Sequence, residues 1–220
     1  MIKCVVFDFD GTLYDSNEIK QRAFFDSSSE YAEAHDFLRQ LLANPDAGDR
    51  YAIFREFAAH LVSLGLSDEA APELGLKLAK NYSDICFKRI SRCKEISGSE
   101  ATLRSLKQSS LKLYINSATP DEALKALVDS RNISPLFDGI LGSSHSKTTN
   151  LIFILHKENI MNDQMIMVGD NNADYQSAIN VGCHFIGIGE SKNAFTTTPH
   201  ILLPDLTNLS LVIGTISPKR

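Results

Sequence analysis

The stretch Val5-Val6-Phe7-Asp8-Phe9-Asp10-Gly11-Thr12-Leu13, close to the N-terminus, says more about the fold than any other part of the sequence. A short run of β-branched and aromatic residues, typical of a buried strand, ends in two carboxylates one residue apart. A glycine and a threonine then break the strand. Two acids this close repel each other and are costly to ionise together. We therefore expect this strand end to face a cation or to share a proton.

After residue 95, apolar runs of strand length alternate with amphipathic helical segments, which predicts a parallel sheet covered by helices on both faces, a Rossmann-like α/β fold. The expected strands are Leu111–Asn116, Gly139–Leu141, Met165–Val168, Phe185–Ile188 and Ile201–Leu203. The expected helices are Asp121–Arg131, Leu151–Glu158 and Ala173–Val181. The strand at Val5 belongs with this sheet.

Between residues 15 and 94 the sequence has helical periodicity and no strand signal. One apolar stripe of a helix comprises Ile53, Phe54, Phe57, Leu61 and Leu64. Asp49 is a suitable N-cap for this helix and Gly65 a suitable stop, whereas Ser67 is expected to cap the next helix, with Pro72 near its first turn. We therefore predict a core domain of residues 1–14 and 95–220 that carries an inserted helical domain of residues 15–94.

The composition is that of an ordinary globular protein, with 43% hydrophobic residues, 22% charged residues and a net charge of −5. This charge disfavours nucleic-acid binding, and no apolar run approaches the length that spans a membrane. The first residues lead directly into a strand and lack the features of a secretory signal. The four cysteines have no metal-binding spacing. We therefore expect reduced thiols in a cytoplasmic protein.

Polar residues follow three of the expected strands, at the edge of the sheet where ligands of parallel α/β proteins bind. Asp8 and Asp10 follow the first strand, Ser117 follows Leu111–Asn116, and Asp170 and Asp174 follow Met165–Val168. Lys147 lies in the segment Ser143–Lys147, which we expect to be a loop at the same edge. Several carboxylates at one edge suit Mg²⁺, which takes oxygen ligands and a substrate phosphate oxygen.

Such a cluster can divide the work of phosphate-ester chemistry among its members. One carboxylate beside Mg²⁺ can attack phosphorus and form an aspartyl phosphate. A lysine and a hydroxyl can neutralise and orient the remaining phosphate oxygens. A second carboxylate, two residues further along, can protonate the leaving oxygen and later activate water.

Four of these features together resemble the motifs of the haloacid dehalogenase superfamily. They are Asp8-Phe9-Asp10-Gly11-Thr12-Leu13, the serine after a second strand, the lysine, and Gly-Asp-x-x-x-Asp from Gly169 to Asp174. The helical insertion resembles the C1-type cap of that superfamily. The segments Phe137–Ile140 and Gly169–Gly187 resemble phosphatases similar to phosphoglycolate phosphatase.

The resemblance implies a role for each candidate residue. Asp8 is the implied nucleophile and Asp10 the general acid/base. Asp8 and Asp170 bind Mg²⁺ through their side chains, and Asp10 does so through its backbone carbonyl. Ser117 and the amide of Ala118 hold phosphate, Lys147 bridges the nucleophile and the phosphate, and Asp174 orients Lys147 or a metal-bound water. The dehalogenases of the superfamily lack the second acid, so Asp10 favours phosphate-ester chemistry.

The expected function is a Mg²⁺-dependent phosphatase that hydrolyses a small phosphorylated metabolite, as a monomer or a dimer that binds neither nucleic acid nor membranes. Two alternatives stay open: a sugar phosphomutase of the same family, and a non-catalytic domain that binds phosphate or Mg²⁺. Individual residues also have simpler interpretations. Ser117 could cap the helix that follows it, Lys147 could be a solvated lysine, and Asp174 could be an acid at a helix N-terminus.

Overall fold

The computed structural model describes residues 1–44, 47–190 and 195–216. The chain forms two compact units, Met1–Ser16 with Cys93–Arg220, and Asn17–Arg92, which we call the core unit and the helical unit. The domain boundaries expected from the sequence fall after residue 14 rather than 16 and before residue 95 rather than 93. Each unit is described by itself below.

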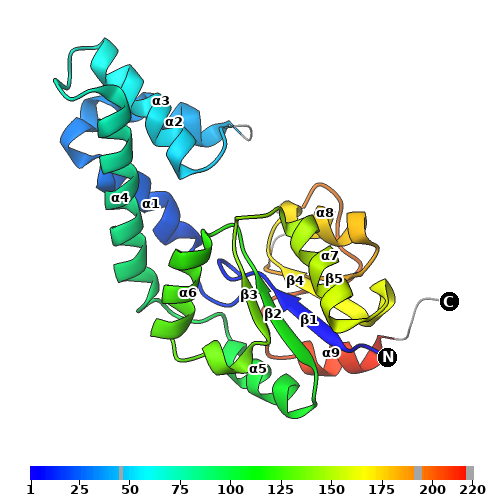
Figure 1. Ribbon diagram of the computed structural model, residues 1–220. Coiled ribbons are helices and arrows are strands. Elements are labelled where there is room, and N and C mark those ends of the chain that lie inside the picture. Colours follow the sequence, from blue (N-terminus) through cyan, green and yellow to red (C-terminus); the bar gives the residue numbers. More distant parts are fainter. Residues whose placement is uncertain (45–46, 191–194, 217–220) are drawn as a thin grey trace. The chain divides into compact units, whose positions relative to one another are not determined.

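The described residues of the core unit contain a six-stranded sheet whose strands are all parallel (Figure 1). The strand order is β3-β2-β1-β4-β5-β6. The strands are β1 (Cys4–Phe7), β2 (Lys112–Asn116), β3 (Gly139–Leu141), β4 (Met165–Gly169), β5 (His184–Ile188) and β6 (Leu202–Leu203). The predicted parallel α/β fold is confirmed, and every expected strand is present within one residue of its predicted ends.

Helices cover the sheet on both faces, which is why β1 is apolar along its whole length and fully buried. On one face lie α7 (Lys147–Glu158) and α8 (Asn172–Val181), whose apolar side chains form one core with alternate residues of β1 and β4. On the other side of the sheet lie α5 (Ser99–Gln108), α6 (Asp121–Ser130) and α9 (Leu209–Thr215) (Figure 1). The described residues also contain the short 3₁₀ helices η1 (Ser29–Ala34) in the helical unit, and η2 (Ser134–Leu136) and η3 (Asn162–Gln164) in the core unit.

The strand order places the end of β1 where the chain changes direction across the sheet. After β1 the chain continues to β2 on one side, and from β3 it crosses to β4 on the other side of β1. Ligands of open α/β sheets bind beyond the strand ends at this kind of switch point. The residues after β1, β2 and β4 are therefore neighbours, although they are far apart in the sequence.

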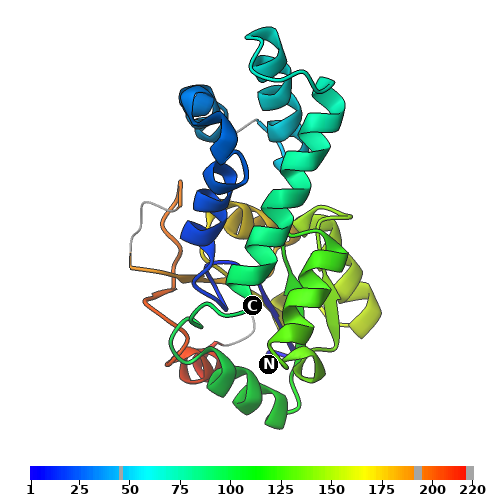
Figure 2. The same cartoon turned by 90° about the vertical axis from the view of Figure 1, so that its left-hand side faces the viewer.

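The helical unit consists of α1 (Asn17–Ser27), α2 (His35–Ala43), α3 (Arg50–Ser63) and α4 (Ala71–Ile90), together with η1. Figure 2 shows α1 and α4 running side by side. Their contact includes Phe24 and Tyr82, whose ring centroids are 4.4 Å apart, and Phe54 of α3 packs against both rings. These aromatic contacts give the unit a small core of its own.

The helix ends in this unit follow the sequence signals in part. Asp49 caps α3, since its carboxylate accepts hydrogen bonds from the amides of Tyr51 and Ala52, and Gly65 follows the helix with a φ of 70°. The predicted cap at Ser67 is wrong, because α4 begins after Ala70, with Pro72 in its first turn. Leu64 is 56% exposed and does not join the buried stripe of α3.

Three helices were not individually predicted. The first, α1, buries only Ala23 and Ser27, so its apolar pattern is weak. The other two, α5 and α9, are short and pack against each other from distant parts of the chain. None of the helices in the described residues is long and apolar enough to cross a membrane. All four cysteines are thiols rather than disulfides.

Candidate active site

The ends of β1 and β4 meet directly. Phe7 pairs with Val168 in the sheet, and the amide of Asp8 donates to the carbonyl of Val168 over 2.9 Å. On the other side of β1, Phe7 pairs with Ile115. The strand ends therefore bring together Asp8, Asp10, Ser117, Asp170 and Asp174 on one edge of the core unit, as the sequence suggested.

Lys147 reaches this edge from the first turn of α7 and not from a loop. Its ammonium nitrogen lies 2.9 Å from Asp8 Oδ1 and 2.5 Å from Asp174 Oδ1. The Lys147 side chain is only 12% exposed, and those of Asp8 and Asp174 are 5% and 0% exposed. An ordinary solvated lysine would not show this burial or this pairing. Lys147 instead pairs with two buried carboxylates at once.

The proton equilibria of this cluster follow from burial and from the charges it brings together. Burial alone would lower the pKa of Lys147, but the carboxylates of Asp8 and Asp174 more than offset this effect and raise the pKa. The lysine is therefore an ammonium ion at neutral pH. Burial, and then the nearby charge of Asp8, raises the pKa of Asp174 well above its ordinary value.

Asp170 completes a group of three acids that could hold a metal ion. Carboxylate oxygens of Asp8, Asp170 and Asp174 all lie within 4.8 Å of one another. Oδ2 of Asp174 is buried and has no hydrogen-bond partner. Asp170 Oδ1 accepts hydrogen bonds from Thr12 at 3.5 Å and from Asn171 at 3.1 Å. Clustered carboxylates with an unsatisfied buried oxygen fit the oxygen ligation that Mg²⁺ requires.

The motif Gly-Asp-x-x-x-Asp has a steric reason for its glycine. A Cβ atom on Gly169 would lie 2.4 Å from both Cβ and Cγ of Asp174. Only a residue without a side chain allows β4 to end this close to the first turn of α8. This approach is what brings the Asp174 carboxylate under Lys147.

Asp10 is 8% exposed and is held by two hydroxyl groups. Ser16 Oγ donates to Asp10 Oδ1 over 2.7 Å, and Thr119 Oγ1 donates to Asp10 Oδ2 over 2.9 Å. Neither hydroxyl was assigned a role from the sequence. Thr119 belongs to the same strand end as Ser117, which is a signal that could have found it. Ser16 follows a turn whose geometry the sequence does not specify.

Ser117 is 2% exposed and follows β2 directly. Its Oγ accepts a hydrogen bond from the amide of Thr119 over 3.1 Å, and its own amide donates to the carbonyl of Leu141. Because the Thr119 amide is the donor, the hydroxyl proton of Ser117 remains available for an acceptor. The alternative prediction, a cap for α6, is not what the structure has, since α6 begins after Pro120. Ala118 is exposed next to it.

Two buried amides fix the start of α7 and thereby Lys147. Asn116 Nδ2 donates to the backbone carbonyl of Lys147 over 3.0 Å. Asn150 Nδ2 donates to Asn116 Oδ1 over 2.9 Å and to the carbonyl of Gly142 over 3.0 Å. Ser146 caps the helix through the amide of Thr149. The two asparagines were also missed, because their pairing depends on contacts 34 residues apart.

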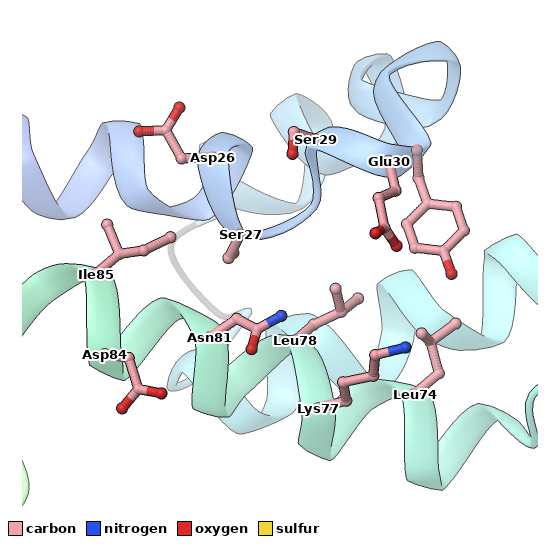
Figure 3. A pocket seen from close by; sticks show the side chains of 11 residues that line it. Asp26, Ser27, Ser29, Glu30, Leu74, Lys77, Leu78, Asn81, Asp84 and Ile85 are labelled. Atoms are coloured by element: carbon pink, nitrogen blue, oxygen red, sulfur yellow. The ribbon is translucent and has the colours of Figure 1, made fainter.

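The helical unit contains a separate cavity of about 290 Å³ between α1, η1 and α4 (Figure 3). Asp26, Glu30, Lys77, Asn81 and Asp84 are among the side chains that line it. Two of these form ion pairs with residues outside this set: Lys77 pairs with Glu69 at 2.6 Å, and Asp26 pairs with Arg89. The cavity includes none of the predicted site residues.

Comparison with known proteins agrees with this geometry. The family model of haloacid dehalogenase-like hydrolases matches residues 5–188. A phosphoglycolate phosphatase from Vibrio cholerae serotype O1 is 24% identical over 217 residues, covering 87% of this chain and 86% of that protein.

Two crystal structures show the same fold. That of a predicted phosphoglycolate phosphatase from Haemophilus somnus 129PT has a TM-score of 0.76 at 16% identity and covers 96% of this chain and 98% of the other. That of a "putative beta-phosphoglucomutase" from Thermotoga maritima also has a TM-score of 0.76 at 16% identity and covers 98% and 100%. The resemblance inferred from the motifs is confirmed: the chain belongs to the family of haloacid dehalogenase-like hydrolases, and it is similar to the phosphoglycolate phosphatases.

Proposed function

We propose that this protein is a Mg²⁺-dependent phosphatase that hydrolyses a small phosphorylated metabolite through an aspartyl-phosphate intermediate. One observation carries the proposal. Asp8, Asp170 and Asp174 present carboxylate oxygens within 4.8 Å of one another, with the ammonium of Lys147 against Asp8 and the second acid, Asp10, two residues further along the chain. Phosphoryl transfer depends mainly on positioning and charge stabilisation, and this cluster supplies both.

The side chains of Asp8 and Asp170 and the backbone carbonyl of Asp10 are the groups that we assign to the Mg²⁺ ion. The unsatisfied buried oxygen of Asp174 supports a cation at this place, since a buried acceptor without a partner is costly. A bound Mg²⁺ ion would neutralise the negative charge of the substrate phosphate and of the attacking carboxylate. Asp174 acts mainly through Lys147, to which it is paired.

Asp8 is the nucleophile in this mechanism. Its carboxylate oxygen forms a bond to phosphorus, and the bond from phosphorus to the ester oxygen of the substrate breaks. The ammonium of Lys147, 2.9 Å from Asp8 Oδ1, offsets the charge that the phosphate brings against this carboxylate. The hydroxyl of Ser117 and the amide of Ala118 donate to the other phosphate oxygens.

Asp10 moves the protons. It gives a proton to the leaving ester oxygen in the first step. It then takes a proton from a water molecule whose oxygen attacks phosphorus, which breaks the bond to Asp8 and releases inorganic phosphate. Its two hydrogen bonds, from Ser16 and Thr119, hold the carboxylate in one orientation for both steps.

The helical unit is proposed to act as a cap that closes over the substrate and excludes water during the first step. The curated relative from V. cholerae is a phosphoglycolate phosphatase, so 2-phosphoglycolate is the first substrate to test. We further propose a cytoplasmic protein, monomeric or dimeric, that needs neither nucleic acid nor membrane.

A sugar phosphomutase is the second candidate, because the T. maritima structure has the same fold. A mutase would keep the aspartyl phosphate and pass it to a sugar hydroxyl rather than to water. A non-catalytic phosphate or Mg²⁺ binder is less well supported, because Asp8, Asp10 and Asp170 are all present.

The test is phosphate release from a panel of phosphorylated metabolites that includes 2-phosphoglycolate and hexose phosphates. We expect release with Mg²⁺, loss of release in EDTA, and recovery on adding Mg²⁺ back. Asp8→Asn should abolish turnover and leave the circular dichroism spectrum unchanged. Near-normal hydrolysis by this variant would contradict the mechanism.

Isomerised sugar phosphate with little free phosphate would identify a mutase. Binding of Mg²⁺ without turnover of any phosphorylated metabolite in the panel would favour the hypothesis of a non-catalytic binding domain. Asp205→Asn, an acid distant in the sequence from the four motifs, is the matched control and should retain full activity.

A further inference from the structure

Arg131 makes two contacts that connect it to both segments joining the core unit to the helical unit. It lies at the C-cap of α6. Its guanidinium carbon lies 4.1 Å from the centroid of the Tyr14 ring, and its Nη2 donates to the backbone carbonyl of Cys93 over 2.7 Å. Tyr14 precedes the helical unit in the sequence and Cys93 follows it.

These two segments are themselves paired. The amide of Asp15 donates to the carbonyl of Lys94 over 3.0 Å, and Tyr14 forms an antiparallel bridge with Glu95. Arg131 therefore binds one segment through an aromatic ring and the other through a carbonyl. A planar guanidinium can stack and donate at the same time, which a lysine ammonium cannot do in the same way.

Tyr14 stabilises the chain reversal that follows Asp10. Its side chain is fully buried. Its backbone carbonyl accepts hydrogen bonds from the amides of Gly11 at 2.8 Å and Ser16 at 2.9 Å. The hydroxyl of Ser16 then donates to Asp10 Oδ1 over 2.7 Å. A continuous set of contacts thus leads from Arg131 through Tyr14 and Ser16 to the Asp10 carboxylate.

We propose that Arg131 is a positioning residue for the proton transfer at Asp10, acting through its contacts with Tyr14 and Cys93. The proposal rests on the proposed role of Asp10 as general acid. In this scheme Arg131 acts on Asp10 through Tyr14 and Ser16 and takes no part in binding the substrate. Arg131 fixes the ring of Tyr14 and the carbonyl of Cys93. These groups stabilise the turn Asp10–Ser16, which sets the orientation of the Asp10 carboxylate.

Substrates with different leaving groups distinguish this positioning role from a purely structural one. An alkyl phosphate needs a proton on its leaving oxygen, whereas p-nitrophenyl phosphate releases a stable phenolate without one. A misplaced Asp10 should therefore reduce kcat/KM for the alkyl ester and spare the aryl ester. General loss of folded protein would reduce both by the same factor.

The experiment compares kcat/KM for the best alkyl phosphate of the panel and for p-nitrophenyl phosphate. For Arg131→Met, which keeps the aliphatic stem, we expect at least a 10-fold loss with the alkyl ester and no more than a 2-fold loss with the aryl ester. Tyr14→Leu should show the same pattern. Arg104→Met, which removes an exposed arginine of α5, is the control and should change neither value.

Equal losses for the two esters, or no loss, would overturn the inference. If Arg131→Met does not fold, Arg131→Lys is tested by the ratio of kcat/KM for the alkyl ester to kcat/KM for the aryl ester. A fall in this ratio of 3-fold or more supports the proposal, and an unchanged ratio refutes it. Asp10→Asn distinguishes this failure from that of the proposed function. If Asp10→Asn shows the selective loss and the Arg131 variants do not, only the role of Arg131 is wrong. If wild-type protein releases no phosphate, the proposed function itself fails.

Discussion

The side-chain amide of Asn150 donates to Oδ1 of Asn116 over 2.9 Å, and this buried pair joins β2 to α7. Asn116 uses its own amide to hold the Lys147 carbonyl. The first turn of α7 is therefore fixed by side chains from inside the core, and this fixes the position of Lys147. Charge placement in the site depends on two neutral residues that touch none of its carboxylates.

Asn150→Asp should destabilise the protein and lower activity. The new carboxylate has no donor for Asn116 Oδ1 or for the carbonyl of Gly142, and it is buried opposite both acceptors. Leaving such groups unpaired costs about 1–3 kcal/mol, with more for a buried charge. Urea unfolding at pH 7 would measure the loss. Asn180→Asp, the same change at an exposed position of α8, should stay within about 0.5 kcal/mol of wild type.

Gly169→Ala should disrupt the site by displacing the backbone that carries Asp174. The added methyl group would lie 2.4 Å from atoms of Asp174, so either β4 or the first turn of α8 must shift. Overpacking of this kind costs about 1–3 kcal/mol and should abolish most of the phosphatase activity. Gly214→Ala is the matched control in α9, where nothing lies within 4 Å of the new Cβ. That variant should be as stable as wild type or slightly more stable. Full activity in Gly169→Ala would show that the close approach is unnecessary.

Mg²⁺ should stabilise the folded protein, because the proposed site would hold it between acids that repel one another without it. At a free concentration 100 times the dissociation constant, the expected gain is about 2.7 kcal/mol, seen as a rise in Tm. Asp170→Asn should lose most of this gain. Without Mg²⁺ the same variant should be at least as stable as wild type, because one of the mutually repelling carboxylates is gone. Sodium chloride of equal ionic strength is the control, and an equal rise with it would speak against a specific site.

Asp138 provides a test of how stability depends on pH, away from the proposed metal site. Burial alone would raise its pKa, but hydrogen bonds from Lys107, the amide of Leu113 and Lys112 lower the pKa to about 2. An unfolded aspartate has a pKa of about 3.9. The stabilisation is therefore complete above the unfolded value and is lost as the pH falls through the folded value.

Asp138→Asn should lower the free energy of unfolding by about 1 kcal/mol at pH 7, since the partly exposed lysines are screened by solvent. Urea unfolding at several pH values between 7 and 2.5 should show the difference from wild type shrinking below pH 4. Glu56→Gln, at an exposed position of α3, serves as the control. A difference that stays constant over this range would contradict the assigned cause.

The sheet and the edge that carries the candidate site could be predicted because their signals are local. Buried parallel strands are continuous apolar runs, and the polar residues that end them are visible in the sequence. The edge location of Asp8, Ser117 and Asp170 followed from the rule that parallel strands finish on the same side. The helix α7 was expected to begin later than it does, because the residues after Lys147 are polar and the apolar pattern starts at Leu151.

What could not be predicted depends on contacts between distant segments. The hydrogen bond from Thr119 to Asp10 spans 109 positions, and no periodicity reports it. The helix α5 is stabilised by α9 and by a hydrogen bond from Thr102 to the carbonyl of Leu206, 104 positions away. Ser67 is a good N-cap type, yet its Oγ accepts from the amide of Glu69 in a turn before α4. The preference of Ser67 for an N-cap position is met instead within this turn, because the N-cap of the helix itself is Ala70.

The central position of β1 has a consequence for synthesis on the ribosome. Val5 pairs with Leu113 on one side and with Ile166 on the other, so β1 is made before its partners in the sheet, which lie more than a hundred residues downstream. The whole helical unit emerges before either partner does. Until then an unpaired apolar strand is available for aggregation, and charged residues next to such a strand oppose it. Lys3 before β1 and Asp8 and Asp10 after it are such gatekeepers. The nascent chain is thus protected by the same acids to which we assign the chemistry of the folded protein.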